Sequence, residues 1–487
     1  MKVWGGVAWL VGGLSLALGC GDESSPADGS DGPDPTTNGS ATAGSGEGPT
    51  TGEITGADTA DGESGEPSVR PNWHEDIAPL VVEHCGGCHV DGGIAPYPLE
   101  DYAETSPLAP IMALQAEARL MPPWHAVETD ECDPYAAFKH DARLSDEQVQ
   151  LFRDWADAGA PEGDPALAAP LPTPPSLDLA DPTVTAPMQS AVSVEPAGSS
   201  LDFFHCLSLD PGNTQDVYVD GMQVIAGNRR IVHHVLVYVD VNATSASWPG
   251  GVSENCGGGA GTSDAVLVGA WVPGGLPMET PAGVGIRMPA GARIILNMHY
   301  HALPTGAEVD DATSLALRWQ TSPPEYVSEF TLIGAPAEGD ITTAPFLVPA
   351  GAAGHQETVE YTVPFIGPVD VRVFSIVNHM HKVGVDLKVW VEDRDSGAET
   401  CLLQTPKWDF NWQRSYAYDT PIASSFRVRS GDTVKVRCTY DNTLGNPGVQ
   451  EMLAEIGAKD PVDVVLGEGT LNEMCVTGLG VAIKGGL

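Results

Sequence analysis

The chain has 487 residues and a formal net charge of −43 at pH 7. Because single hydrophobic cores rarely grow beyond about 250 residues, this length predicts about three domains. The strong acidity excludes the basic surface that nucleic-acid binding requires, so no nucleic-acid partner is expected.

The first 20 residues, 1–20, have the features of a secretory signal peptide. Lys2 is followed by an apolar run that ends at Gly19 and Cys20, and this run is too short for a membrane span. Cys20 resembles the lipidated cysteine of a lipobox, although Ala17 stands where that motif prefers leucine. The alternative is ordinary cleavage beside an unrelated cysteine. We expect an exported lipoprotein, anchored to a membrane through Cys20, in the periplasm, at the outer membrane or on the cell surface.

Residues 21–68 have the composition of a flexible acidic tether. The segment is rich in Ser, Thr, Gly and Asp, and it contains no Lys or Arg. It also lacks the apolar residues needed to form a core. A tether of this kind is useful only where its start is anchored, which favours lipidation of Cys20.

A c-type haem attachment motif follows, in Cys85-Gly-Gly-Cys88-His89. Two thiols at this spacing can bond to the two vinyl groups of a haem, and the adjacent imidazole can bind the iron. A local disulfide and half of a zinc site are the alternatives, but no second Cys/His pair follows at zinc spacing. The motif therefore predicts one covalently bound haem c.

The second axial ligand of the iron must come from further along the chain. Met121 is our prediction, because it lies in an extended stretch before two prolines that can approach the iron. Met112 is more typical of a packed helix, and His125 and His140 are weaker candidates.

An amphipathic helix after Ser145 closes this unit. Ser145 and Gln148 form a capping box, and Val149, Phe152 and Trp155 lie on one apolar face. The stretch 69–165 resembles a small class I cytochrome c, which implies a small all-α haem domain.

The remaining chain is predicted to be rich in β-strands. Residues 166–187 are dense in proline, alanine and aspartate, which is typical of a semi-stiff linker. Beyond them, short segments rich in β-branched residues alternate with turn residues, as at 230–240, 292–301 and 369–377. About 300 such residues suit two antiparallel β-sandwiches.

Several histidines and one methionine stand out in these segments. They are His233-His234, His299 and His301, His379 and His381, and Met474. Alternate residues of a strand face one side, so each His-x-His pair can direct two imidazoles to one place. His233 and His234 are adjacent, so they can share a metal only where the strand is irregular. A lone histidine is usually a satisfied core or surface residue, but three clusters in apolar strands favour a metal. Imidazoles with a thioether favour copper over zinc.

These motifs, in this order and at comparable distances, resemble the copper type II, ascorbate-dependent monooxygenases. That family includes peptidylglycine α-hydroxylating monooxygenase and dopamine β-monooxygenase, and the resemblance covers residues 185–487. It implies two jelly-roll-like β-domains, at 188–335 and 336–487, with one copper on each. The predicted fold class is therefore multidomain, with a small all-α cytochrome c domain followed by two antiparallel β-sandwich copper domains.

The resemblance also implies a role for each histidine group. His233, His234 and His299 would hold an electron-transfer copper, and His379, His381 and Met474 would hold the copper that binds dioxygen. His301 matches no ligand position, and we place it beside the ligands. We thus predict two copper ions and one haem c as cofactors.

The implied reaction uses O₂ to hydroxylate an aliphatic carbon of a small-molecule substrate, with electrons from an ascorbate-like reductant or a redox protein. Val377 stands where peptide-amidating enzymes have an arginine that binds the substrate carboxylate, so peptide amidation is not supported. We hypothesise that the haem feeds electrons to the copper sites. The alternative is a non-catalytic haem and copper electron-transfer or copper-binding lipoprotein.

Nine cysteines divide among these uses. After the lipid and haem cysteines are set aside, six remain, and an even number in an exported chain suggests disulfides whose connectivity is not given by spacing. The family resemblance implies the pairs Cys438–Cys475 and Cys206–Cys256. Cys132 and Cys401 then remain, and we hypothesise that they join the haem segment to the second copper domain.

Overall fold

The structure is a computed structural model. It describes residues 70–485 apart from 92–94, 174–175, 177, 198–200, 255, 304–305, 335–345, 366 and 468–470. The predicted signal peptide with Cys20 and the predicted tether lie outside the described residues, so both stay predictions. Within the described part, no helix combines the length and the hydrophobicity needed to cross a lipid bilayer.

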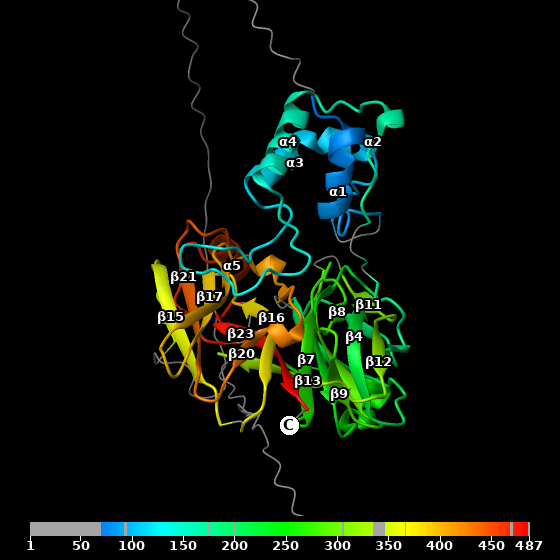
Figure 1. Ribbon diagram of the computed structural model, residues 1–487, viewed down its shortest axis with the longest axis vertical. Coiled ribbons are helices and arrows are strands. Elements are labelled where there is room, and N and C mark those ends of the chain that lie inside the picture. The colour runs from blue at the N-terminus through cyan, green and yellow to red at the C-terminus, as the bar shows by residue number, and fades with distance from the viewer. Residues whose placement is uncertain are drawn as a thin grey trace, which may run out of the picture. The chain divides into compact units, whose positions relative to one another are not determined.

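Four short helices pack together near the start of the described chain (Figure 1). They are α1 (Ala78–His84), α2 (Tyr102–Thr105), α3 (Ala109–Glu117) and α4 (Asp146–Asp157). Trp73, Phe152 and Trp155 are buried in their common core, where the rings of Trp73 and Trp155 lie 6.1 Å apart. The capping box predicted at Ser145 and Gln148 is present and begins α4.

The prediction of an all-α cytochrome c domain at 69–165 is wrong. Residues 118–145, between α3 and α4, contain no helix, and the described residues from Arg70 onward form one compact unit. Trp124, Ala126 and Phe138 are buried in the hydrophobic core of the C-terminal β-strands. We call residues 124–139 the arm. The arm belongs to the β structure, because its apolar side chains pack against residues far along the chain.

The first β half, residues 184–333, is a two-layer sandwich. One layer has the strand order β6-β3-β10-β5-β7. These strands are β6 (Val252–Glu254), β3 (Asp202–Leu209), β10 (Arg293–His301), β5 (Val232–Asp240) and β7 (Ala265–Trp271). The other layer contains β1 (Val184–Pro187), β12 (Ser314–Gln320), β4 (Val217–Ile225) and β9 (Val284–Met288). Val235 and Leu296 of the first layer share a buried core with Val219 and Leu317 of the second.

Short strands extend this half. The two-residue β8 (Met278–Glu279) pairs with β4, and β2 (Val192–Val194) pairs with β11 (Glu308–Asp310). Strands predicted at 230–240 and 292–301 are present as β5 and β10, which carry the first histidines.

The second β half, residues 347–484, is also layered. One layer has the order β15-β21-β17-β18, formed by β15 (Ala353–Thr362), β21 (Thr433–Asp441), β17 (Gly384–Glu392) and β18 (Glu399–Thr405). The facing strands are β23 (Val476–Lys484), β16 (Val371–His379), β19 (Ser415–Ala417) and β20 (Phe426–Val428). Val389 and Val436 of the first layer pack in one core with Ile376 and Leu479 of the second. This half also contains α5 (Pro447–Ile456) and the pair β14 (Leu347–Val348) and β22 (Val464–Val465).

One ten-stranded sheet runs through both halves. β13 (Tyr326–Ile333) of the first half pairs antiparallel with β23 of the second and parallel with β9. The sequence predicts two separate sandwiches, whereas the structure has sandwiches that share a continuous layer. The two histidine-bearing halves are therefore fixed to each other by backbone hydrogen bonds.

Three disulfides brace these layers. They are Cys206–Cys256, Cys438–Cys475 and Cys132–Cys401. The first two are the pairs that the family resemblance implies. The third joins the arm to β18, so the arm is held to the second β half by a covalent bond as well as by packing.

Candidate metal centres

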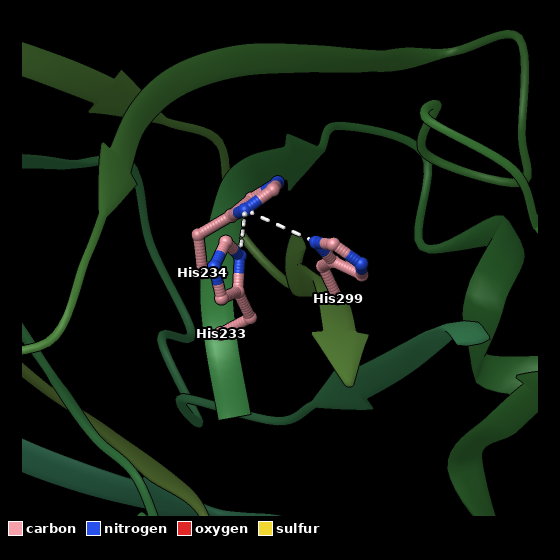
Figure 2. Close-up of side chains that lie close together, drawn as sticks. All are labelled: His233, His234 and His299. Atoms are coloured by element: carbon pink, nitrogen blue, oxygen red, sulfur yellow. Dashed lines mark hydrogen bonds between the residues drawn. The ribbon is translucent and has the colours of Figure 1, made fainter. Parts of the chain in front are cut away.

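Three imidazoles from neighbouring strands converge in the first β half (Figure 2). His234 on β5 lies opposite His299 on β10, while Tyr300 lies opposite Val232. His233 therefore has no opposite residue and is the extra residue of a β-bulge. The bulge brings the rings of His233 and His234 to one side of the strand, which is the irregularity that a shared metal requires.

The ring nitrogens of this three-histidine cluster fit a metal ion. Nδ1 of His234 lies 3.2 Å from Nδ1 of His233 and 3.2 Å from Nδ1 of His299. Two nitrogens that each lie about 2 Å from one metal in a tetrahedral arrangement are about 3.3 Å apart, so the spacing matches. Burial lowers the pKa of His233 to about 4 and holds the pKa of His234 well below its ordinary value. Both rings are therefore neutral near pH 7, as metal ligands must be.

Asp202 orients one of the three rings. Its Oδ1 accepts hydrogen bonds from Nε2 of His299 and from Nδ1 of His301, each over 2.9 Å. Burial raises the pKa of the Asp202 carboxyl, but the bonds from His299 and His301 outweigh it and hold that pKa well below its usual range. Because Nε2 of His299 carries the proton, its Nδ1 presents a lone pair to the cluster. His301 binds the same carboxylate and is not one of the three converging imidazoles.

His379 and His381 form a second group at the end of β16. Their ring centroids lie 5.0 Å apart. Nδ1 of His379 donates to Oε1 of Gln413 over 2.7 Å, and Nδ1 of His381 donates to the backbone oxygen of Asn472 over 3.0 Å. Both oxygens only accept, so each Nδ1 carries the proton and each Nε2 is the atom that can bind a metal. Burial lowers the pKa of His379, which keeps its ring neutral.

Glu473 and Met474 lie beside His381. The fully buried Glu473 carboxylate accepts hydrogen bonds from the backbone N–H groups of His381, Val383 and Met474 at 2.8, 2.9 and 3.0 Å. Burial raises the pKa of the Glu473 carboxyl to about 7, and these N–H groups oppose the rise. The hydroxyl of Tyr440 donates to the backbone oxygen of Met474 over 2.9 Å. The backbone at Met474, the predicted thioether ligand, is thus held next to His381.

One loop contacts both histidine groups. Residues 406–414, which we call the bridging loop, connect β18 to β19, and the ring of Phe410 lies 5.9 Å from the ring of His233 and 5.8 Å from that of His381. The loop and the three-histidine cluster together line a cavity of about 200 Å³. Its lining consists of His233, His234, Val272, Pro273, Phe410, Asn411, Trp412 and Gln413. Among these described residues there is no carboxylate, lysine or arginine.

The predicted haem motif directly follows α1. Cys85 and Cys88 are half-buried free thiols, and burial raises the pKa of Cys85 to about 12. Nδ1 of His89 donates to the backbone oxygen of Tyr97 over 2.8 Å, so Nε2 is the nitrogen that can bind iron. The unpaired thiols and the orientation of this ring fit a covalently attached haem. Met121 lines a cavity of about 580 Å³ to which none of these three motif residues contributes.

Sequence reasoning found the histidines and missed the residues that orient them. Asp202 and Gln413 belong to no motif, because they meet His299 and His379 only through strand pairing and through the path of the bridging loop. Glu473 stands in the Glu-Met-Cys motif, but nothing in the motif indicates that it binds three backbone N–H groups. An acidic residue directly before a predicted ligand, at the start of the largely apolar segment 474–483, was the one clue available.

These features define a protein with two histidine-based candidate metal centres on a β-sandwich scaffold. Residues 352–479 match the C-terminal domain of the copper type II ascorbate-dependent monooxygenases. The matched segment contains the second group, His379 and His381, together with Met474. It does not extend to the three-histidine cluster. No match was found among curated proteins.

Solved structures are more distant. Peptide-N(4)-(N-acetyl-β-D-glucosaminyl)asparagine amidase aligns over 62% of this chain and 96% of its own, with 11% identity and a TM-score of 0.27. PNGase F, a glycosylasparaginase from Flavobacterium meningosepticum, aligns over 60% and 96%, with 11% identity and a TM-score of 0.25. An allantoicase aligns over 49% and 75%, with 11% identity and a TM-score of 0.14. TM-scores this low establish neither a shared fold nor a shared activity.

Proposed function

We propose that this chain is a copper-dependent monooxygenase that hydroxylates an aliphatic C–H bond of a small substrate. The main support is the three-histidine cluster, in which Nδ1 of His234 lies 3.2 Å from Nδ1 of His233 and from Nδ1 of His299. The same chain has a His-x-His group inside a segment that matches the C-terminal domain of this family. The balanced reaction is R–H + O₂ + 2 e⁻ + 2 H⁺ → R–OH + H₂O. The electrons come from an ascorbate-like reductant or from a redox protein.

The two histidine groups have different roles in this proposal. Bound copper supplies one-electron chemistry at the three-histidine cluster and dioxygen activation at His379, His381 and Met474. The thioether of Met474 favours Cu(I), the oxidation state that dioxygen requires. Gln413 holds the ring of His379 with Nε2 directed away from its own hydrogen bond, so the ligand nitrogen is set before a metal arrives.

The substrate we propose is small and uncharged. Val377 cannot bind a substrate carboxylate. The cavity beside the three-histidine cluster also reaches Gln413, the partner of His379, and its described lining carries no carboxylate, lysine or arginine. The cavity volume of about 200 Å³ exceeds the roughly 150 Å³ that accommodates benzene in an engineered protein cavity.

The decisive experiment is copper content in the purified chain. We expect two coppers per chain, about one in His299→Ala, about one in His379→Ala, and none in the double variant. Substrate-dependent O₂ uptake that disappears in His379→Ala would complete the case. Two coppers without O₂ uptake on any uncharged substrate would instead favour a non-catalytic copper protein, and zinc in place of copper would end the proposal.

We further propose that Cys85 and Cys88 attach a haem c whose iron is bound by His89, with Met121 as the second axial ligand, and that this haem passes electrons to the copper sites. The free thiols and the Nδ1 hydrogen bond of His89 support the attachment. A pyridine haemochrome spectrum should show one covalent haem, which Cys88→Ala loses in part and Cys85→Ala with Cys88→Ala loses entirely. Absence of covalent haem after maturation in a bacterial periplasm would end this part.

Export and lipid anchorage at Cys20 also belong to the proposal. They are supported by the apolar run that ends at Cys20 and by the acidic segment that follows. Labelling with radioactive palmitate should mark the chain and should fail in Cys20→Ala. Labelling that persists in this variant would contradict anchorage at this residue.

A further inference from the structure

The bridging loop places one aromatic ring between two histidine groups that belong to different β halves. The ring of Phe410 stacks on His233, with an interplanar angle of 29° and centroids 5.9 Å apart. The same ring meets the ring of His381 edge-on, at 82° and 5.8 Å. A single side chain thus touches a ring from each group, in the two geometries that aromatic rings prefer.

The loop is fixed firmly on the side of the second β half. The indole Nε1 of Trp408 donates to the backbone oxygen of His381 over 3.1 Å, and the backbone N–H of Trp408 donates to the backbone oxygen of Val385 on β17 over 3.0 Å. Gln413 donates from Nε2 to the backbone oxygen of Phe410 over 3.2 Å, while its Oε1 binds His379. The position of Phe410 is therefore tied to the second histidine group.

Toward the first β half, the contact of Phe410 is ring packing against His233. His233 is the extra residue of the bulge in β5, and His381 lies beyond the end of β16. The shared sheet fixes the backbones of the two halves, but ladder hydrogen bonds do not fix these two rings.

We propose that Phe410 is a spacer that sets the separation between the two copper sites. This inference rests on the proposed function, because it concerns where two bound coppers are held. Phe410 has no ligand atom and is a positioning residue. It governs the gap that an electron crosses between the two metals, and the stiffness with which that gap is kept.

The first test uses the metal-free protein, so it does not depend on copper chemistry. Histidine-selective ¹³C labelling gives 13 ring signals, of which those of His233 and His381 are assigned by His233→Gln and His381→Gln. Phe410→Ala should shift both signals, and Phe410→Leu should shift both by a smaller amount. Phe365→Ala, which removes a phenylalanine that is 87% exposed, is the matched control and should shift neither. A shift at only one of the two histidines would overturn the spacer.

The second test measures the two coppers directly. Wild-type protein loaded with two Cu(II) ions should show a defined magnetic dipolar splitting by electron paramagnetic resonance. Phe410→Ala should retain two coppers but lose the resolved splitting, because the separation becomes variable, and Phe365→Ala should keep it. Two coppers with an unchanged splitting in Phe410→Ala would overturn the inference and leave the proposed function intact. Fewer than two coppers in the wild type would overturn the proposed function, and the histidine signals would still decide whether Phe410 spans the two groups.

Discussion

Asp202 decides which nitrogen of His299 faces the candidate metal. It holds the proton on Nε2 through a 2.9 Å hydrogen bond, so Nδ1 is the ligand atom. Removing the charge in Asp202→Asn weakens this acceptor, and residues that orient a metal-bound imidazole typically contribute about 10- to 100-fold in affinity. We expect a loss of that size at the three-histidine cluster. Competition with a copper chelator, in a His379→Ala background so that one site remains, measures it.

His301 provides the matched control for Asp202. It donates to the same Oδ1 atom but is not one of the converging imidazoles, so His301→Gln leaves the partner of His299 in place. We expect its effect on copper affinity to be clearly smaller than that of Asp202→Asn. Equal losses of copper affinity in both variants would mean that the Asp202 carboxylate positions the end of β10 as a whole rather than the ring of His299.

Glu473 supports the backbone beside the second histidine group, His379 and His381, and does not contact the three-histidine cluster. Its two oxygens satisfy three backbone N–H groups in a fully buried position, and Glu473→Gln replaces one oxygen by an amide that also donates. A buried donor left without an acceptor costs about 1–3 kcal/mol. We expect a free energy of unfolding lower by this amount and weaker copper binding at the His379 group, with the three-histidine cluster unchanged.

Glu357 allows the two effects of Glu473→Gln to be separated. It is also a buried carboxylate, 4% exposed, and it accepts from Nε2 of His355 over 2.8 Å. Glu357→Gln should lower stability while both coppers are retained, as measured by thermal unfolding and metal analysis together. Full copper occupancy in Glu473→Gln would show that Glu473 stabilises the fold without positioning His381.

At the scale of elements, the arm is joined to the second β half at several points. Backbone hydrogen bonds run from Tyr135 to Cys401 over 3.2 Å and from Lys139 to Ala417 over 2.8 Å. The disulfide between Cys132 and Cys401 closes a span of 269 residues. Cross-links over long loops restrict the unfolded chain strongly, and loss of a native disulfide typically costs about 2–5 kcal/mol. We expect Cys132→Ala with Cys401→Ala to lower the free energy of unfolding by that amount in denaturant titrations.

The single variants test whether the loss comes from the cross-link. Cys132→Ala and Cys401→Ala should each destabilise about as much as the pair of substitutions together, since either one abolishes the same bond. Additive losses would point to packing of the two side chains instead. If the double variant has the same denaturant midpoint of unfolding as the wild type, the disulfide adds no stability beyond the arm's own contacts.

The β-bulge at His233 shows where prediction from sequence reaches its limit. Periodicity along the chain predicts that His379 and His381 face one side, and their ring centroids lie 5.0 Å apart. His381 lies beyond the end of β16, however, so it is placed by its hydrogen bonds to Glu473 and Asn472. Strand periodicity thus predicted the grouping of this pair without its cause. It was not enough for His233 and His234, since a bulge is a property of the pairing between β5 and β10. The sequence indicates that His233 and His234 can share a metal only if the strand is irregular. The pairing register with β10 shows that it is.

At the scale of the whole molecule, the sequence indicated the β-rich C-terminal part and the order of its histidine motifs. The prediction of a cytochrome c domain was wrong, because residues close in sequence were assumed to pack together. Trp124 and Phe138 lie between helical segments in sequence, yet they pack with Tyr416 and Tyr418 of the second β half. Contacts between residues nearly 300 positions apart leave no periodic pattern in either segment. The pattern of neighbouring residues therefore could not predict that these two segments pack together.

Two buried phenylalanines from the same stretch of sequence can test this division of the molecule. Phe138 on the arm is 7% exposed in the core of the second β half, and Phe152 on α4 is 2% exposed in the helical core. Truncation of a buried phenylalanine typically costs about 3–5 kcal/mol. We expect Phe138→Ala to lower the temperature at which the His379 site releases copper, because this side chain supports the strands beneath that site. Phe152→Ala should reduce the helical signal in circular dichroism and leave the copper-release temperature close to that of the wild type. The reverse outcome, with copper release sensitive to Phe152 and insensitive to Phe138, would restore the arm to the helical segment and separate it from the copper-binding half.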